Sequence, residues 1–140
     1  MAYTCGMNLF MQGKLIMCEL TLSSLPKTWI FDFDGTLVVH NGYKNGEDKL
    51  LPGVKNFLDN IPSDDFVLII TGREEAAREK TIDFIKKQGL RCDSILFALP
   101  LGERILFNDK KPSGLKMSHS VNLNRNEGLS KIRIKIDSSI

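Results

Sequence analysis

Residues 29–37 read Trp-Ile-Phe-Asp-Phe-Asp-Gly-Thr-Leu, an apolar run that ends in two carboxylates followed by glycine and threonine. The run is apolar at successive positions, which is typical of a central strand buried on both faces of a parallel sheet. Residues two apart on a strand point to the same face, so Asp32 and Asp34 project together unless the chain turns at Asp34. Open α/β sheets place their ligands at the carboxyl ends of strands, and we therefore expect a functional site here.

A carboxylate in this position can attack phosphorus and form an aspartyl-phosphate, which divides a difficult hydrolysis into two easier transfers. Two close carboxylates repel each other, and a hard cation relieves that repulsion. Gly35 allows a close approach of the backbone to a ligand, and Thr36 adds a hydroxyl and an amide. Acidic pairs after a strand also occur as helix caps or solvated turns, but the surrounding pattern favours a functional site.

The segment from Phe31 to Thr36 resembles the first signature of the haloacid dehalogenase-like (HAD) superfamily, in the phosphatase form with a second Asp two residues after the nucleophile. The resemblance implies that Asp32 is the nucleophile and that Asp34 protonates the leaving oxygen and then activates water. It also implies an α/β fold, Rossmann-like and three-layered, with a mostly parallel central sheet. Dehalogenation is disfavoured, because Asp34 would have no evident task in it.

A second apolar run, residues 66–70, ends in Thr71, Gly72 and Arg73 and resembles the superfamily's second signature, whose Ser or Thr holds a phosphoryl oxygen. Thr71 lies 39 residues after Asp32, which is long enough for one helical crossover but not for an inserted domain. Thr before Gly also caps helices, and both roles can coexist because a helix N-terminus is itself an anion site. We expect Thr71 to act in catalysis. The expected substrate-binding residues are Gly35, Thr36, Gly72 and Arg73.

A third apolar run, Arg104 to Phe107, predicts a strand that ends at Asn108 and Asp109. The superfamily's last signature supplies carboxylates to magnesium from such a strand end, and Asp109 matches it. Asn108 stands where some relatives carry another acid, and its amide oxygen can ligate a hard cation or hold a water for it. Magnesium takes only one or two carboxylates from protein. The resemblance therefore implies a Mg²⁺ site formed by Asp32, the carbonyl of Asp34, Asp109 and Asn108.

The superfamily's third signature, a Lys that neutralises the phosphoryl group, has no clear counterpart in the chain. It normally stands on a helix before the last acidic strand, and residues 94–103 leave no room for one, since Pro100 and Gly102 favour a hairpin turn. Lys110 is the preferred substitute, because it needs no extra element to reach the site. The alternatives are Lys80, Lys86, Lys87 and Lys111, and any of the five is otherwise a solvated surface lysine. Loss of this charge would make an enzyme slow or substrate-selective.

The segments between these runs complete one α/β domain. Apolar spacing predicts helices over residues 48–60, with Pro52 in the first turn, and over 74–88, ended by Gly89. Strand, helix, strand, helix, strand is the order of a parallel sheet with right-handed crossovers. The intervals of 39 and 38 residues between the three strand ends are filled by ordinary crossovers, so we expect a capless core. An open site then implies a large substrate, or a homo-oligomer in which a neighbouring subunit completes the site.

We expect an N-terminal extension over residues 1–27, a catalytic core over 28–128 and a C-terminal tail or edge strand over 129–140. The extension is interpreted as an added hairpin, an oligomer arm or a consequence of the start position. Residues 117–123 alternate enough to predict a further strand. The loop over 38–47 is either a small flap, whose Tyr43 could meet a leaving group, or a surface turn rich in Asn and Gly.

Composition excludes several other functions. The 140 residues are 42% hydrophobic and 26% charged with a net charge of +2, a balance that does not favour nucleic-acid binding. No apolar run approaches membrane-spanning length, and the N-terminus does not resemble a secretory signal, so no membrane partner is expected. The three cysteines show no metal-binding spacing and favour reduced thiols in a cytoplasmic protein. Two histidines are too few for a histidine metal cluster.

Residues 108–115 and 122–128 are also similar to small capless members of the superfamily that are linked to sugar and capsular polysaccharide biosynthesis. The sequence thus predicts a magnesium-dependent phosphomonoester hydrolase that acts through an aspartyl-phosphate on a small phosphorylated sugar or related metabolite. The alternative is a catalytically weak or inactive module that binds a phosphosugar or nucleotide, as the missing third signature and Asn108 would permit.

Overall fold

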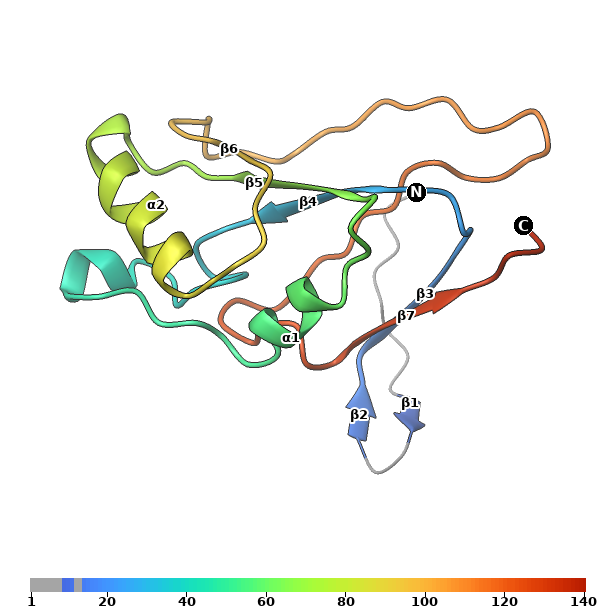
Figure 1. Cartoon of the computed structure of the whole chain (residues 1–140), viewed down its shortest axis with the longest axis horizontal. Coiled ribbons are helices and arrows are strands. Elements are labelled where there is room, and N and C mark those ends of the chain that lie inside the picture. The colour runs from blue at the N-terminus through green and yellow to red at the C-terminus, as the bar shows by residue number, and fades with distance from the viewer. Residues whose placement is uncertain (1–8, 12–13) are drawn as a thin grey trace. The chain divides into compact units, whose positions relative to one another are not determined.

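The computed structural model describes residues 9–11 and 14–140, which form two compact units (Figure 1). The core unit comprises Pro26–Leu101 and Leu123–Ser130. The terminal unit comprises the described residues up to Leu25 together with Gly102–Asn122 and Lys131–Ile140. The chain is a mixed α/β protein with short sheets that contain parallel strands, and this is compatible with a Rossmann-like fold.

The core unit is built on a parallel sheet of three strands in the order β4-β5-β6, formed by Thr28–Asp32, Phe66–Ile70 and Ser94–Leu96. Asp32 lies opposite Ile70 in the register, so the ends of β4 and β5 are neighbours. The strands expected before Asp32 and Thr71 are therefore confirmed. In this sheet the middle position belongs to β5, whereas β4, which we expected to be central, lies at the edge.

One face of this sheet is buried and the other is partly exposed. The rings of Trp29 and Phe31 meet Phe57 of α1 (Val54–Asp59) edge to face, with centroids 5.8 and 6.0 Å apart. Successive residues of a strand point to opposite faces, so the residues between them face away from α1. On that second face three apolar side chains stay about half exposed: Ile30 (50%), Phe66 (45%) and Leu96 (47%). Within the core unit the second face of this sheet is thus only partly covered, and the three-layer arrangement stays a prediction.

The helix expected over residues 74–88 is confirmed as a 3-10 turn η2 (Glu75–Ala77) that continues into α2 (Arg78–Lys87). Gly89 ends it with a left-handed φ of 62°. The amides of Gly89 and Leu90 donate to the carbonyls of Lys86 and Ile85, each at 3.0 Å, which is the hydrogen-bond pair of a Schellman cap. The glycine was therefore a correct stop signal.

Helix α1 is shorter than the helix expected over residues 48–60. Gly53 directly before it has a left-handed φ of 76°, so helical geometry begins only at Val54. Pro52 consequently lies outside the helix rather than in its first turn. The apolar periodicity does belong to a helix, but the left-handed backbone at Gly53 divides the segment.

The terminal unit contains an antiparallel hairpin and a parallel strand pair. The hairpin joins β1 (Leu9–Met11) to β2 (Lys14–Ile16), in agreement with one interpretation of the N-terminal extension. Strand β3 (Cys18–Leu22) pairs in parallel with β7 (Ile132–Ile136), which confirms the strand among the C-terminal residues. The divisions expected at residues 27/28 and 128/129 stay predictions.

Two strands expected between residues 102 and 123 are absent from the described chain. The run from Arg104 to Phe107 is irregular, and so is most of 117–123. A strand requires a partner that accepts and donates its hydrogen bonds. No described segment pairs with Arg104–Phe107, whose apolar side chains Ile105, Leu106 and Phe107 are 76, 59 and 91% exposed. The hairpin expected at Pro100 and Gly102 therefore does not form either.

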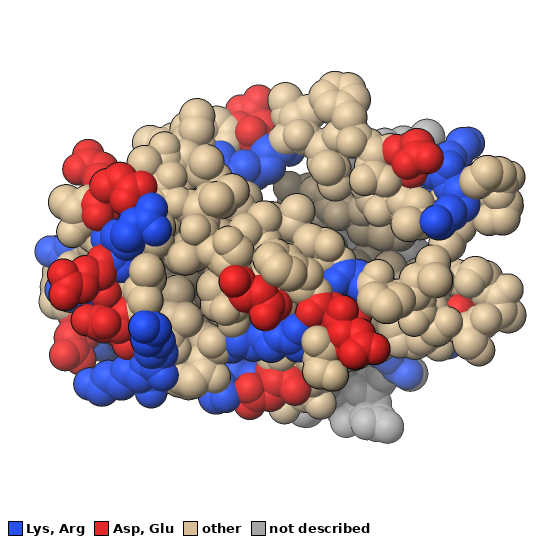
Figure 2. Space-filling view, turned by 45° about the horizontal axis from the view of Figure 1, so that its top comes forward, with Lys and Arg blue, Asp and Glu red and all other residues tan. Residues whose placement is uncertain are grey.

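Two further sequence expectations concern the surface and the cysteines. Acidic and basic side chains are interspersed on the face drawn in Figure 2, as the near-neutral composition suggests. No helix among the described residues combines the length and the apolar character needed to cross a bilayer. Reduced thiols were expected throughout, but Cys18 is disulfide-bonded, while Cys92 is a free thiol.

The starts of β4 and β5 depend on Asp65, which generates a first prediction. Its buried carboxylate accepts hydrogen bonds from the Lys27 amide at 3.1 Å and from Trp29 Nε1 at 2.8 Å. Replacement of Asp65 by alanine removes the shared acceptor of two partly buried hydrogen bonds, and we expect a loss of about 1–3 kcal/mol in the free energy of unfolding. Urea denaturation measures it, with the exposed neighbour as control in Asp64→Ala. Equal losses in the two variants would contradict the role of Asp65.

Candidate functional site

The site forms where the chain turns directly after β4. The Phe33 carbonyl accepts hydrogen bonds from three successive amides, those of Thr36, Leu37 and Val38, at 3.2, 2.9 and 3.2 Å. Burial alternates along the turn, so that apolar side chains point inward and polar ones stay accessible. Phe31, Phe33 and Leu37 are buried, whereas Asp32, Asp34 and Thr36 are partly exposed. The apolar positions of the signature thus hold its three polar side chains on the open side of the turn.

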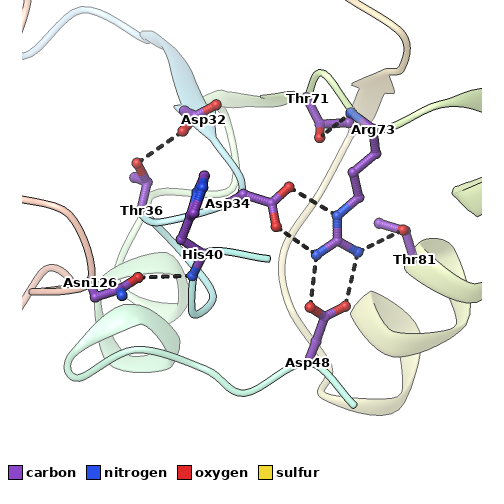
Figure 3. Close-up of polar contacts among 9 residues, drawn as sticks. All are labelled: Asp32, Asp34, Thr36, His40, Asp48, Thr71, Arg73, Thr81 and Asn126. Carbon is purple, nitrogen blue, oxygen red and sulfur yellow. Dashed lines mark hydrogen bonds and ion pairs between the residues drawn. The ribbon is translucent and has the colours of Figure 1, made fainter. Parts of the chain in front are cut away.

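The two carboxylates of the signature engage different partners (Figure 3). Asp32 Oδ2 accepts a hydrogen bond from the Thr36 hydroxyl at 3.3 Å. Both oxygens of Asp34 accept from the Arg73 guanidinium, Oδ2 from Nε at 3.0 Å and Oδ1 from Nη2 at 2.9 Å. The chain does turn at Asp34, which is the alternative that the sequence left open. Asp32 and Asp34 therefore do not share one side of an extended strand.

The Arg73 guanidinium is buried and uses every one of its N–H groups. Besides Asp34, it donates to both oxygens of Asp48, at 2.9 and 2.7 Å, and to the Thr81 hydroxyl at 2.9 Å. Its Cζ lies 3.9 Å from the ring centroid of Tyr43. Side-chain exposure is 1% for Arg73 and 2% for Asp48. This guanidinium ties the strand end of β5 to the turn after β4 and to the loop over residues 38–50.

Electrostatics keeps this cluster charged. Burial by itself lowers the pKa of Arg73, but the hydrogen bonds and charges of Asp48 and Asp34 raise that pKa by more, and the net shift is upward. The guanidinium therefore stays ionised at any physiological pH. Since no donor of Arg73 is left over, a substrate contact by this residue would require one of these bonds to open. The substrate-binding role expected for Arg73 stays a prediction, and the observed contacts are those of a residue that positions Asp34.

Thr71 and Gly72 follow β5 and are covered. Thr71 is 1% exposed, and its hydroxyl oxygen accepts from the Arg73 amide at 3.1 Å, so it organises the turn that leads into η2. A Cβ atom on Gly72 would overlap Leu101 Cδ2, which means that the Leu101 side chain lies directly over this glycine. Contact of a phosphoryl group with Thr71 or Gly72, which stays a prediction, would require the segment over 99–101 to move.

The residues expected to complete the metal site belong to the terminal unit. Asn108, Asp109 and Lys110 lie in an irregular, exposed segment, where Asn108 Nδ2 donates to the Asp109 carbonyl at 2.9 Å. Their expected roles stay predictions. No group of three or more His, Cys, Asp and Glu side chains able to hold a metal occurs within residues 9–11 and 14–140. In the core unit, the carboxylate of Asp32 and the carbonyl of Asp34 are oxygen donors of the kind that fits Mg²⁺, which keeps several of its waters.

Three residues of this site were missed by sequence reasoning. Asp48 and Thr81 bind Arg73. Asn126 binds both sides of the turn over residues 33–38, which we call the signature turn. Its backbone amide donates to the Gly35 carbonyl at 2.9 Å, and its side-chain Oδ1 accepts from the His40 amide at 2.8 Å. The contacts of Asp48 and Asn126 join residues 25 and 86 positions apart and that of Thr81 spans eight, so the short apolar and turn patterns do not predict them. Tyr43 lies in the loop that the sequence leaves as either a flap or a surface turn, and the contact of its ring with the Arg73 guanidinium shows that this loop packs onto the site.

Cys92 offers no competing nucleophile. Burial raises the pKa of its thiol, assisted by the negative charge of Asp93. A thiol with a raised pKa is protonated at neutral pH and reacts slowly.

Comparisons of the chain with protein-family models, with curated proteins and with solved structures find no match.

The Arg73 cluster generates a second prediction. Lysine carries one compact ammonium and cannot donate to two carboxylates in the planar arrangement of a guanidinium. We expect Arg73→Lys to lower the free energy of unfolding by about 3 kcal/mol, because buried carboxylates lose charged hydrogen bonds. The control is Arg78→Lys, whose guanidinium pairs with Glu75 on the exposed surface and contacts the ring of Phe97, and whose replacement should lower the free energy of unfolding by less than about 1 kcal/mol. Chemical denaturation of both variants compares them, and an unaffected Arg73→Lys protein would contradict the structural role.

Proposed function

We propose that this protein is a magnesium-dependent phosphomonoester hydrolase of the HAD type, with Asp32 as the nucleophile. The observation that supports the proposal is the position of Asp32. Asp32 is partly exposed at the carboxyl end of a parallel strand, its carboxylate receives a hydrogen bond from Thr36, and the turn that follows it is lined by buried apolar residues. Parallel α/β sheets place reacting groups at this end of their strands.

The reaction would proceed in two balanced steps. An oxygen of Asp32 attacks phosphorus as the bond from phosphorus to the leaving oxygen breaks, and Asp34 gives that oxygen a proton. Water then attacks the aspartyl-phosphate, Asp34 takes back a proton, and inorganic phosphate leaves with Asp32 restored. Magnesium, when bound, supplies positive charge that offsets the phosphoryl oxygens.

Asp48 allows Asp34 to act in catalysis, because it can keep Arg73 paired when Asp34 releases it. A catalytic Asp34 must release an oxygen from Arg73 to reach a substrate and must carry a proton in part of the cycle. Arg73 would then keep its paired hydrogen bonds to Asp48, at 2.7 and 2.9 Å, so the buried guanidinium would not be left without a counter-charge. The guanidinium thus orients Asp34, while Asp48 alone would still supply it with a counter-charge.

The finer features of the proposal extend the resemblance. They are a capless three-layer core, a phosphorylated sugar or related metabolite as substrate, a cytoplasmic location, and contributions from Asn108, Asp109 and Lys110. A neighbouring subunit would cover the open site if the protein is a homo-oligomer. Bulk charge supports neither nucleic acid nor membrane as a partner, since basic and acidic residues number 19 and 17.

The second candidate function is a binding module with little or no turnover. It is favoured by the burial of Thr71, by the cover of Leu101 over Gly72, and by the complete engagement of Arg73. These groups would have to rearrange before they could hold a transferring phosphoryl group. A module that binds a phosphosugar or nucleotide does not require such a rearrangement at every cycle.

Hydrolysis gives the third prediction. Phosphate release from a panel of sugar phosphates and nucleotides should require magnesium, stop with a chelator, and fall by at least about a thousandfold in Asp32→Asn, because the nucleophile is removed. The matched control is Asp59→Asn, which alters an exposed Asp on α1 and should retain the activity. Absence of turnover in the wild-type chain across the panel would reject the hydrolase and favour the binding module.

Asp34 gives the fourth prediction. p-Nitrophenyl phosphate has a leaving group that needs little protonation, so Asp34→Asn should still form the aspartyl-phosphate but fail to activate water for its hydrolysis. We expect a burst of about one nitrophenol per protein followed by slow turnover, and a phosphorylated protein visible by mass spectrometry. Circular dichroism checks that the variant is folded. A folded Asp34→Asn variant with full steady-state turnover would contradict the role of Asp34.

A further inference from the structure

A C-terminal segment of the core unit, residues 123–130, returns to the signature turn. Asn126 bridges the turn by donating to the Gly35 carbonyl and accepting from the His40 amide, and 86 residues separate His40 from Asn126. Figure 3 shows Asn126 and His40 on the same side of the site as Asp32 and Thr36. The segment therefore contributes directly to the surroundings of the expected nucleophile.

Close backbone contacts fix this segment against the rest of the core unit. The Leu129 amide donates to the Pro52 carbonyl at 2.9 Å, and Leu129 is 4% exposed. A Cβ on Gly128 would overlap the same carbonyl, and a Cβ on Gly53 would come within 2.5 Å of the Ser130 nitrogen. Two glycines thus permit an approach that side chains would prevent. The position of the residues between Asn124 and Gly128 is set by these contacts.

Arg125 is brought over the signature turn by this arrangement. A Cβ on Gly35 would lie 3.2 Å from Arg125 Cγ and 3.8 Å from His40 Nδ1, so the aliphatic part of Arg125 passes across the face of Gly35. Gly35 stands between Asp34 and Thr36, and its φ of 84° together with its missing side chain leaves the room for this contact. The guanidinium, which extends beyond Cγ, is therefore within reach of a ligand bound at Asp32.

The donors of Arg125 are uncommitted, in contrast to those of Arg73. The side chain is exposed and makes no hydrogen bond or ion pair with any residue that the structure describes. A guanidinium is always charged and can present two parallel N–H groups to a phosphoryl group. An exposed, unpaired arginine held over an active-site turn by fixed backbone contacts has the chemistry of an anion-binding residue.

We propose that Arg125 binds the phosphoryl group of the substrate and supplies the positive charge for which the sequence offers no lysine on a helix. The ligand class is a phosphate monoester dianion, or inorganic phosphate itself. The inference rests on the proposed function for the choice of anion, but binding by Arg125 does not depend on turnover. The charge of Arg125 would be supplied from within the core unit, independently of Lys110.

The test measures binding and turnover separately on the full chain. Dissociation constants for inorganic phosphate are determined by calorimetry with magnesium present, and kcat and KM are determined with p-nitrophenyl phosphate. The variants are Arg125→Ala and Arg125→Lys, with Lys135→Ala as the control for loss of an exposed cation on β7. Thermal denaturation verifies that each variant is folded.

We expect Arg125→Ala to weaken phosphate binding and to lower kcat/KM by about 10- to 100-fold, the usual effect of losing a charged hydrogen-bond pair. Arg125→Lys should restore part of both, and Lys135→Ala should match the wild type. Wild-type phosphate affinity in Arg125→Ala, or an equal loss in Lys135→Ala, would overturn the inference.

The two proposals fail in different ways. Turnover that depends on Asp32 but not on Arg125 retains the hydrolase and rejects the role of Arg125. Phosphate binding that depends on Arg125 without any turnover retains the anion site and rejects the hydrolase. A wild-type chain that neither binds phosphate nor hydrolyses the ester rejects both.

Discussion

The candidate site depends on one buried interaction, the guanidinium of Arg73 shared between the carboxylates of Asp34 and Asp48. A buried charge is tolerated only when it is paired and fully hydrogen-bonded, and here all of its donors have acceptors. This requirement fixes the end of β5, the turn after β4 and the loop after that turn relative to one another. The geometry of the site is therefore a consequence of satisfying one cation.

The same turn is approached from the other side by residues 123–130, through hydrogen bonds of Asn126 and close contacts at Gly53 and Gly128. The signature turn consequently lies between Arg73, whose donors are all hydrogen-bonded, and Arg125, whose donors are not bonded to any described residue. In the phosphate site that we propose, this difference would separate two tasks. Arg73 organises the protein's own carboxylates, and Arg125 would bind the incoming anion.

Sequence patterns predicted the parts of the structure that local chemistry determines. Apolar runs located β4 and β5, and Gly89 located the end of α2, because burial and left-handed backbone geometry act over a few residues. The strand expected at Arg104–Phe107 was wrong, since apolar character does not supply a pairing partner. Pro52 was wrongly expected inside the helix, because Gly53 delays the start of α1 to Val54. Within the site, the residues from Phe31 to Thr36 predicted the position of the turn. Sequence patterns did not predict the residues that bind the turn and Arg73, which are Asp48, Thr81 and Asn126, because their contacts form only in the folded chain.

Leu101 over Gly72 has a consequence for the affinity of any ligand that uses the strand end of β5. The side chain is itself 88% exposed, so it can leave with little loss of buried apolar surface. A ligand would meet an equilibrium between covered and uncovered forms, and its apparent affinity would be reduced by the fraction of uncovered molecules. Selectivity could then arise from the leucine as much as from the polar groups beneath it, because only ligands whose differential affinity exceeds the cost of uncovering would shift the population.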